Sequence, residues 1–288
     1  MKISVSSYSF SQLISAGKID QAGVVDKAHE IGFGAVEFTD LAGNSLAEQK
    51  EYAAKIREKA DKLGMDITAY TIYANLYQPG TVSAEIERVK GQLDVAKILG
   101  VPVLRHDACH RLTKTGNGRS FALMLPEISA AAREITAYAE TLGIKTCVEN
   151  HGFIAQDSYR VEMLFNVVNH DNFGLLVDMG NFVCADEDSA TAVSRVAPYA
   201  IYVHAKDMSI HPATFEKGGF TRGGMKFTGE ALGDGIIPIE RNLLTLKRAG
   251  YDGVVSIEYE GERDCIEGIT QGFNNLTQYI KNVENIKF

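Results

Sequence analysis

The feature that most limits the fold is an alternation, sustained along the whole sequence, between short β-rich runs and longer runs with apolar residues at helical spacing. This alternation is typical of parallel sheets whose strands are joined by helices. It predicts eight strands, at residues 3–7, 35–38, 66–71, 102–106, 145–150, 174–178, 200–205 and 254–259.

The runs between the strands predict an outer layer of helices. Apolar residues recur every three or four positions at residues 46–63, 84–99, 125–142 and 239–249. A glycine follows each of these runs directly, at positions 64, 100, 143 and 250. Because glycine adopts the left-handed conformation that ends a helix, each glycine marks the return to the next strand.

Eight βα units without a break in composition favour an α/β fold of the (β/α)8 type, a TIM barrel, formed by residues 1–288 as one domain. An open, doubly wound sheet is disfavoured because its nucleotide-binding fingerprint is missing: Gly32 and Gly34 precede a strand and lack a third glycine. Residues 208–238, between the last two strands, are rich in glycine, and we predict an irregular active-site lid or binding loop there.

Charge, composition and the N-terminal sequence disfavour nucleic acid and a membrane as binding partners. A formal net charge of −8 disfavours nucleic acid, and no run reaches the roughly eighteen apolar residues of a membrane span. A strand that begins at residue 3 leaves no room for an export signal, so we expect a cytoplasmic protein, with a homo-oligomer left open. Four cysteines are scattered along the chain, and most of them are expected to be small core residues: Cys109, Cys147, Cys184 and Cys265.

The residues that end the last four strands are the candidates for chemistry, because a barrel of this type gathers its catalytic groups at the carboxyl ends of its strands. These strands end in Glu149, Asp178, His204 and Glu258. A single carboxylate at a strand end is as readily a solvated or ion-paired residue as a metal ligand. Four consecutive strands that each offer a metal-competent side chain are more informative, since neighbouring strands lie about 4.8 Å apart and end in one mouth.

Three carboxylates so close together repel one another unless a cation neutralises them. Carboxylates and one imidazole form a hard ligand set. We therefore expect one divalent metal ion, Mn²⁺ in the first place, with Mg²⁺, Co²⁺ and Zn²⁺ as alternatives.

With these four residues the chain resembles, over essentially its whole length, the xylose isomerase-like barrel superfamily, in its sugar-phosphate isomerase and epimerase branch. In the ketose epimerases of that branch, Glu, Asp, His and Glu from the last four strands hold the metal, matching the four residues named above. The segment 232–237 resembles the family's Gly-x-Gly stretch. The resemblance implies metal-dependent isomerisation or epimerisation of a keto sugar or sugar derivative through an enediolate, with a small carbohydrate as substrate.

Two residues are expected to be catalytic and five to bind substrate. Glu149 and Glu258 would move the proton on opposite sides of the metal, each keeping one oxygen for the substrate. Period-two alternation places Arg105 with Asp107, His151 with Glu149, and Lys206 with His204 on shared strand faces. A structural ion pair, a loop histidine and a salt bridge remain alternatives for these three. The expected substrate-binding residues, two of them from the resemblance, are Glu37, Arg105, His151, Asn181 and Lys206.

Three other functions stay open at this stage. The same enediolate can lose a hydroxyl or a carboxylate, which gives a dehydratase, another lyase or a decarboxylase. A non-catalytic sugar-binding barrel or subunit is the second alternative. An apurinic endonuclease of the same superfamily is disfavoured, because Asn181 and the run Phe227-Thr228-Gly229 replace residues that ligate metal in those nucleases.

Overall fold

The computed structural model describes residues 1–78, 80–109 and 120–287. It contains a closed barrel of eight parallel strands in the order β1-β11-β7-β6-β5-β4-β3-β2, closed by pairing between β1 and β2. All eight predicted strands are confirmed, and so is the (β/α)8 fold class. The barrel strands are β1 (Lys2–Ser6), β2 (Ala35–Thr39), β3 (Asp66–Ile72), β4 (Val103–His106), β5 (Lys145–Glu149), β6 (Phe173–Asp178), β7 (Ala200–Ala205) and β11 (Val254–Ile257).

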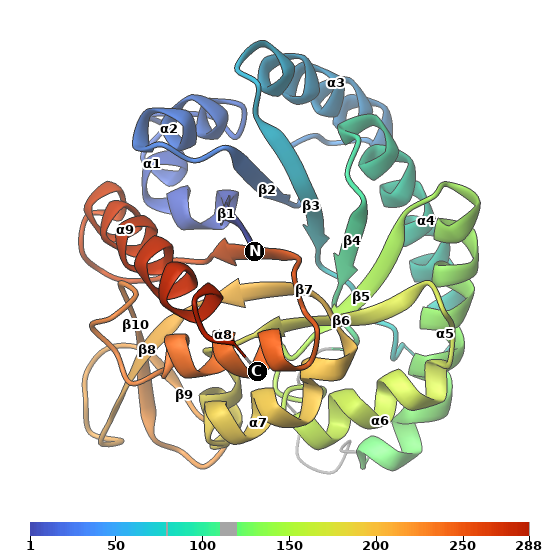
Figure 1. Ribbon diagram of the computed structural model, residues 1–288. Helices are drawn as coiled ribbons and strands as arrows, with labels where there is room; N and C mark the ends of the chain where they lie inside the picture. Colours follow the sequence, from blue (N-terminus) through green and yellow to red (C-terminus); the bar gives the residue numbers. More distant parts are fainter. Residues whose placement is uncertain (79, 110–119, 288) are drawn as a thin grey trace.

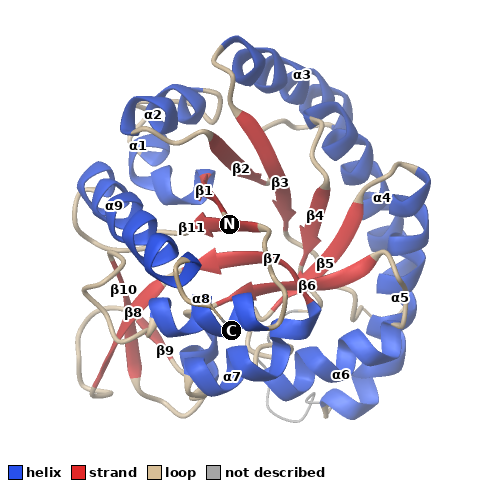
Figure 2. Cartoon of the chain, in the orientation of Figure 1, coloured by secondary structure: helices blue, strands red, loops and turns tan. Residues whose placement is uncertain are grey.

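Helices surround the barrel (Figure 1). Figure 2 shows the same view coloured by secondary structure. Gly64, Gly100, Gly143 and Gly250 have φ of +65°, +71°, +72° and +92°, so the predicted glycine stops are confirmed. The described helices are α1 (Ser11–Ser15), α2 (Gly23–Ile31), α3 (Leu46–Lys62), α4 (Val82–Leu99), α5 (Phe121–Thr141), α6 (Ser158–Val168), α7 (Ser189–Val196), α8 (Ile239–Arg248) and α9 (Cys265–Glu284), with 3-10 turns η1 (Ser7–Phe10), η2 (Asn181–Ala185) and η3 (Ala197–Tyr199).

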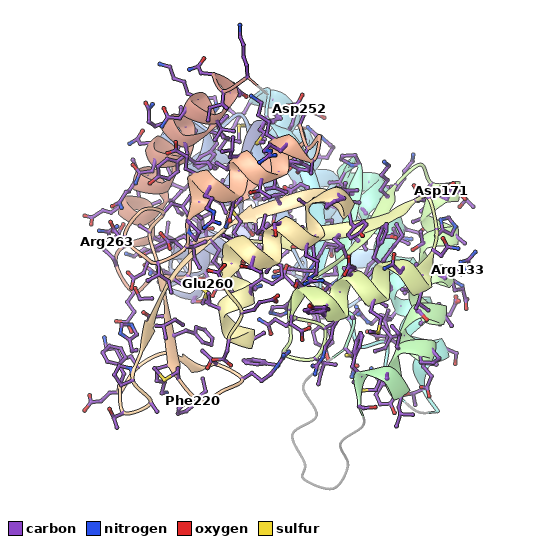
Figure 3. All side chains as sticks on the ribbon, turned by 60° about the horizontal axis from the view of Figure 1, so that its bottom comes forward. Arg133, Asp171, Phe220, Asp252, Glu260 and Arg263 are labelled. Atoms are coloured by element: carbon purple, nitrogen blue, oxygen red, sulfur yellow. The ribbon has the colours of Figure 1, made fainter. Side chains whose placement is uncertain are left out.

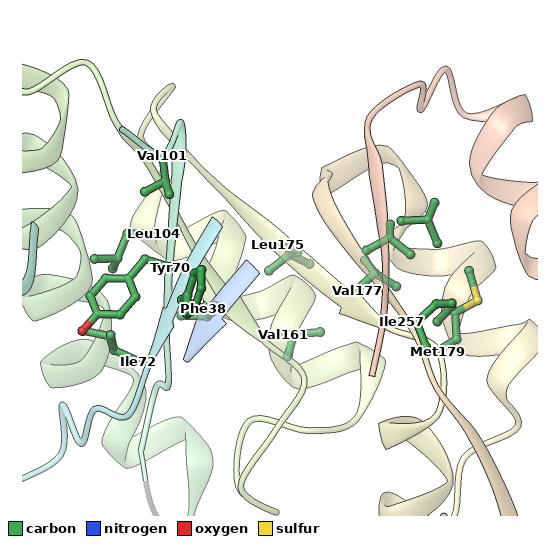
Figure 4. Packing of buried hydrophobic residues seen from close by; sticks show 14 of the residues in the cluster. Phe38, Tyr70, Ile72, Val101, Leu104, Val161, Leu175, Val177, Met179 and Ile257 are labelled. Carbon is green, nitrogen blue, oxygen red and sulfur yellow. The ribbon is translucent and has the colours of Figure 1, made fainter. Parts of the chain in front are cut away.

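Two apolar layers follow from the alternation of side chains along each strand. One layer lies between the sheet and the helices and contains Tyr70, Leu104, Val148 and Val203; part of it is drawn in Figure 4. The other cluster consists of the alternate residues of the same strands, which face the inside of the barrel: Ala69, Val103, Cys147, Leu176 and Tyr202. All four cysteines are buried and unpaired, as expected.

The segment after β7 corrects one expectation. Residues 208–238 were predicted to be irregular, but about a third of this segment belongs to a three-stranded antiparallel sheet of order β8-β10-β9: β8 (Asp207–His211), β9 (Gly219–Phe220) and β10 (Lys226–Glu230). The physical reason is that backbone groups leaving the barrel need partners, and the strands supply them to one another. Figure 3 shows Phe220 at the outer end of this sheet.

Asp207 fixes the return from the small sheet to α8. Its carboxylate is 1% exposed and accepts four backbone N–H bonds. Oδ1 accepts from Met208 at 2.9 Å and Ile237 at 3.0 Å, and Oδ2 accepts from Gly233 at 2.8 Å and Gly235 at 3.0 Å. Position 235 must be glycine because a Cβ there would lie 2.2 Å from Oδ1. The stretch Gly233-Asp234-Gly235 is thus a loop that binds a carboxylate of the chain itself.

We expect Asp207→Asn to lower the free energy of unfolding by about 3 kcal/mol or more, because an amide nitrogen cannot accept two of the four N–H bonds. Urea denaturation measures the change. The matched control is Asp234→Asn, a half-exposed acid of the same loop whose side chain is 44% accessible. Equal midpoints for the two variants would contradict the assigned role of Asp207.

The described residues contain no helix that is long and apolar enough to cross a membrane.

Candidate metal centre

The site is the top layer of the barrel interior. Each interior apolar residue is followed, two positions later on the same strand, by a polar one: Val103 by Arg105, Cys147 by Glu149, Leu176 by Asp178 and Tyr202 by His204. A period of two keeps both residues on the inner face, so the ends of the strands direct these side chains into one space. Glu258 follows β11 in the same way after Ser256.

The four predicted ligands do come together. One donor atom from each of Glu149, Asp178, His204 and Glu258 lies within 4.8 Å of the other three. Nδ1 of His204 is 3.6 Å from Asp178 Oδ2, 3.7 Å from Glu258 Oε2 and 4.0 Å from Glu149 Oε1. Two donors on opposite sides of an ion with bonds of about 2.1 Å lie about 4.2 Å apart, so these three distances suit a cation between them.

Glu37 orients the imidazole. Its Oε1 lies 2.8 Å from Nε2 of His204, and the carboxylate is fully buried. A carboxylate on one ring nitrogen fixes the tautomer and turns the other nitrogen toward a metal. Glu37 lines neither of the cavities at this site. Its contact with His204 suits a residue that supports the pocket.

Backbone N–H groups hold one of the two carboxylate oxygens of Asp178. Oδ1 accepts the N–H groups of Gly180 at 2.7 Å and Asn181 at 2.8 Å, which leaves Oδ2 directed at the cluster. Among the described residues, Asp178 Oδ2 and His204 Nδ1 are buried atoms without a hydrogen-bond partner. Two such atoms facing one another are costly unless a cation lies between them. The donor set and these two atoms therefore fit a divalent metal.

Glu149 has both oxygens engaged by residues expected to bind substrate. Arg105 Nε lies 2.7 Å from Oε2, and Asn181 Nδ2 donates to Oε1 over 2.8 Å. Arg105 also donates to Asp107 Oδ1 at 2.6 Å and to a backbone carbonyl. The ion pair that was left open as an alternative for Arg105 is thus present, and this network holds Glu149 firmly beside the metal position.

Lys206 lies among the carboxylates. Its Nζ is 2.6 Å from Glu258 Oε2, 3.1 Å from Glu260 Oε1 and 3.4 Å from Asp178 Oδ2. Burial alone would lower the pKa of Lys206, but these negative charges raise it well above its usual value, so the side chain is an ammonium. Glu260 was missed in the sequence, although it follows Glu258 at the strand period of two.

His151 forms a dyad with Asp107. Its Nδ1 lies 2.7 Å from Asp107 Oδ1, while 46% of its side chain is accessible. Burial would lower the pKa of His151, but the charge and hydrogen bond of Asp107 outweigh it and raise the pKa. The dyad has the arrangement of a proton-transfer group: one nitrogen is fixed by a carboxylate and the ring borders open space.

A cavity of about 380 Å³ lies above the metal position. Its walls come from the ends of seven of the eight barrel strands. Two tyrosines that no sequence pattern singled out, Tyr8 and Tyr73, also border it. Of the expected site residues, the cavity is lined by Arg105, Glu149, His151, His204, Lys206 and Glu258. Asn181 borders a second cavity of about 300 Å³.

Among curated relatives, the chain is similar to an inosose dehydratase of Clostridium perfringens, 24% identical over 163 residues, 55% of this chain and 54% of that protein. It is also similar to an inosose dehydratase of Lacticaseibacillus casei, 26% identical over 183 residues, 62% of this chain and 56% of that protein. The chain thus spans about half the length of the curated relatives it matches.

Solved structures share the fold over nearly the whole chain. The IOLI protein with a bound zinc atom has a TM-score of 0.76 at 17% identity, covering 99% of this chain and 100% of that one. The probable 3-DHS dehydratase of Bacillus anthracis has 0.72 at 17%, covering 96% and 99%. An L-ribulose 3-epimerase has 0.71 at 15%, covering 99% and 96%. The family model for the xylose isomerase-like TIM barrel matches residues 25–287, and the chain belongs to that family.

Proposed function

We propose that the chain is a divalent-metal-dependent lyase that removes the proton α to the carbonyl of a keto sugar or sugar derivative and then expels a β-hydroxyl as water. The observation that carries the proposal is the pairing, in one cavity, of a metal-ligand cluster with the His151–Asp107 dyad. A divalent cation in the cluster would polarise the carbonyl and its neighbouring hydroxyl and so make the intervening C–H more acidic.

Glu258 is the proposed base. It is the least buried of the four ligands, with 12% of its side chain accessible, and it lines the cavity. Glu149, the other expected catalytic residue, has both oxygens bound by Arg105 and Asn181, which leaves neither oxygen free to reach the substrate. Its proposed role is therefore to hold the metal and not to move the proton.

His151 is the proposed acid. A hydroxyl leaves as water only if a proton reaches its oxygen, and an imidazole whose other nitrogen is held by a carboxylate supplies one. Lys206, which also borders the cavity, would stabilise the negative charge that develops on the substrate oxygens. The names of the relatives are consistent with this reaction, since an inosose dehydratase and a 3-DHS dehydratase both remove water.

Epimerisation is the second candidate, and two observations favour it. The fold is shared with an L-ribulose 3-epimerase, and Glu149 and Glu258 do stand on separate strands of one cluster, as two-sided proton transfer needs. In that case Arg105 would have to release Glu149 when substrate binds.

Mass spectrometry in heavy water separates the two reactions. We expect the metal-loaded protein, given inosose and simple ketoses, to yield a product lighter by one water from at least one of them. A product of unchanged composition with one deuterium at the α-carbon would instead establish isomerisation or epimerisation. Tight sugar binding with neither product nor deuterium uptake would refute enzymatic function and leave a binding barrel.

A further inference from the structure

The second cavity, of about 300 Å³, adjoins the metal cavity but differs from it in character. The two share His151, Lys206 and Glu260 as lining residues, so they form two lobes of one cleft. The metal lobe is lined mainly by ionisable groups. The second lobe has four apolar contributors, which come from the β5–α6 loop, η2, β8 and β10: Phe153, Cys184, Met208 and Phe227.

Phe153 is set in place by a backbone conformation that costs energy. Its φ is +69°, which is rare for an aromatic residue and is retained only where neighbours enforce it. Its N–H donates to Gln156 Oε1 at 2.6 Å, and its carbonyl accepts from Arg222 Nη2 at 2.8 Å. Arg222 is anchored in turn by Asp157 at 2.9 Å. The loop thus holds Phe153 at the wall of the second lobe from two sides.

Phe227 lines the same lobe from the small sheet. Its ring packs over Gly219, where a Cβ would lie 2.4 Å from the ring. A side chain at position 219 would displace the ring, so glycine there is what allows Phe227 its place. The small sheet, in the segment predicted to be a lid or binding loop, therefore supplies an aromatic wall to the cleft.

Apart from His151, Lys206 and Glu260, which the second lobe shares with the metal lobe, its polar side chains are already bound to the protein. Gln156 accepts from Phe153 and donates to the Asn181 carbonyl at 2.9 Å. Asn181 joins Glu149 and Lys206. A sugar in this lobe would find few polar atoms with unused hydrogen-bonding capacity, whereas an apolar group would gain contact with two phenyl rings and a thioether.

We infer that the substrate is a keto sugar or sugar derivative that carries an apolar, preferably aromatic, substituent, with the sugar in the metal lobe and the substituent in the second lobe. This inference rests on the proposed function for the sugar and on the geometry of Phe153, Phe227, Met208 and Cys184 for the substituent. A cleft whose lobes measure about 380 and 300 Å³ lies within the size range of pockets that enclose ligands larger than a monosaccharide.

Three probes test the inference by calorimetric titration of the metal-loaded protein: a 3-keto hexose, its O-phenyl glycoside, and phenyl β-glucoside, which lacks the ketone. We expect the O-phenyl keto sugar to bind at least about tenfold more tightly than the free keto sugar, as burial of one aromatic ring allows. Phe227→Ala should remove this advantage and leave the dissociation constant of the free keto sugar unchanged.

The matched control is Phe220→Ala, on the same sheet, where the ring is 49% exposed and lines neither lobe; it should alter no dissociation constant. Equal affinities for the two keto sugars in the wild type, or an equal loss for both in Phe227→Ala, would overturn the inference. If keto sugars give neither binding nor turnover, the proposed function fails. Binding of phenyl β-glucoside that is lost in Phe227→Ala would then still support the apolar lobe, and its absence would remove that support.

Discussion

Asp178→Ala is expected to reduce the bound divalent metal from about one ion per chain to almost none. Oδ2 of Asp178 is directed into the cluster by two backbone N–H bonds to Oδ1, and its loss removes one of four ligands and one of the three negative charges that attract the ion. His204→Ala should have the same effect, because Nδ1 lies within 4.0 Å of all three carboxylates. Elemental analysis after chelation, reloading and gel filtration measures the stoichiometry.

The control and a graded variant sharpen this test. Glu260→Gln removes a carboxylate from the same mouth, one that contacts Lys206 at 3.1 Å but lies outside the cluster, and it should retain the metal. Glu37→Gln should weaken metal binding by about 10- to 100-fold, because Glu37 acts only through the orientation of His204. Full metal content in Asp178→Ala, with the fold intact by circular dichroism, would rule out this centre.

The sequence predicted those parts of the site that depend on strand periodicity. Glu149, Asp178 and His204 end parallel strands, and in a closed barrel parallel strand ends meet, so their convergence follows from topology alone. The same period of two placed His151 and Lys206 at the cavity. It would also have selected Glu260, two residues after Glu258, had the strand been followed past its first acidic residue.

The rest of the site depends on tertiary contacts that have no local pattern. Glu37 meets His204 from a strand 167 residues away in sequence, and the pairing of His151 with Asp107 spans 44 residues. Neither separation leaves a periodic signal. The small sheet was missed for a related reason: the glycines of residues 218–224 suggested an irregular loop, and only Gly219 among them lies in a strand, which pairs with β10.

Glu258→Gln and His151→Asn are expected to stop different halves of one reaction. Glu258→Gln keeps a carbonyl oxygen for coordination and removes the base, so most metal should remain while deuterium uptake at the α-carbon falls by about 10²- to 10⁴-fold. His151→Asn leaves the cluster intact and removes the acid. It should therefore still exchange the α-proton but lose elimination of water by a similar factor.

Measuring α-deuteration and water loss on the same samples separates these roles, because a structural defect would lower both rates together. His29→Asn, an exposed histidine of α2, provides the control and should alter neither rate. The assignment depends on the order of the two steps: exchange requires only the base, whereas release of water requires the base first and the acid afterwards. If His151→Asn abolishes exchange while Glu258→Gln retains it, then the histidine held by Asp107 is the base, and Glu258 serves the metal alone.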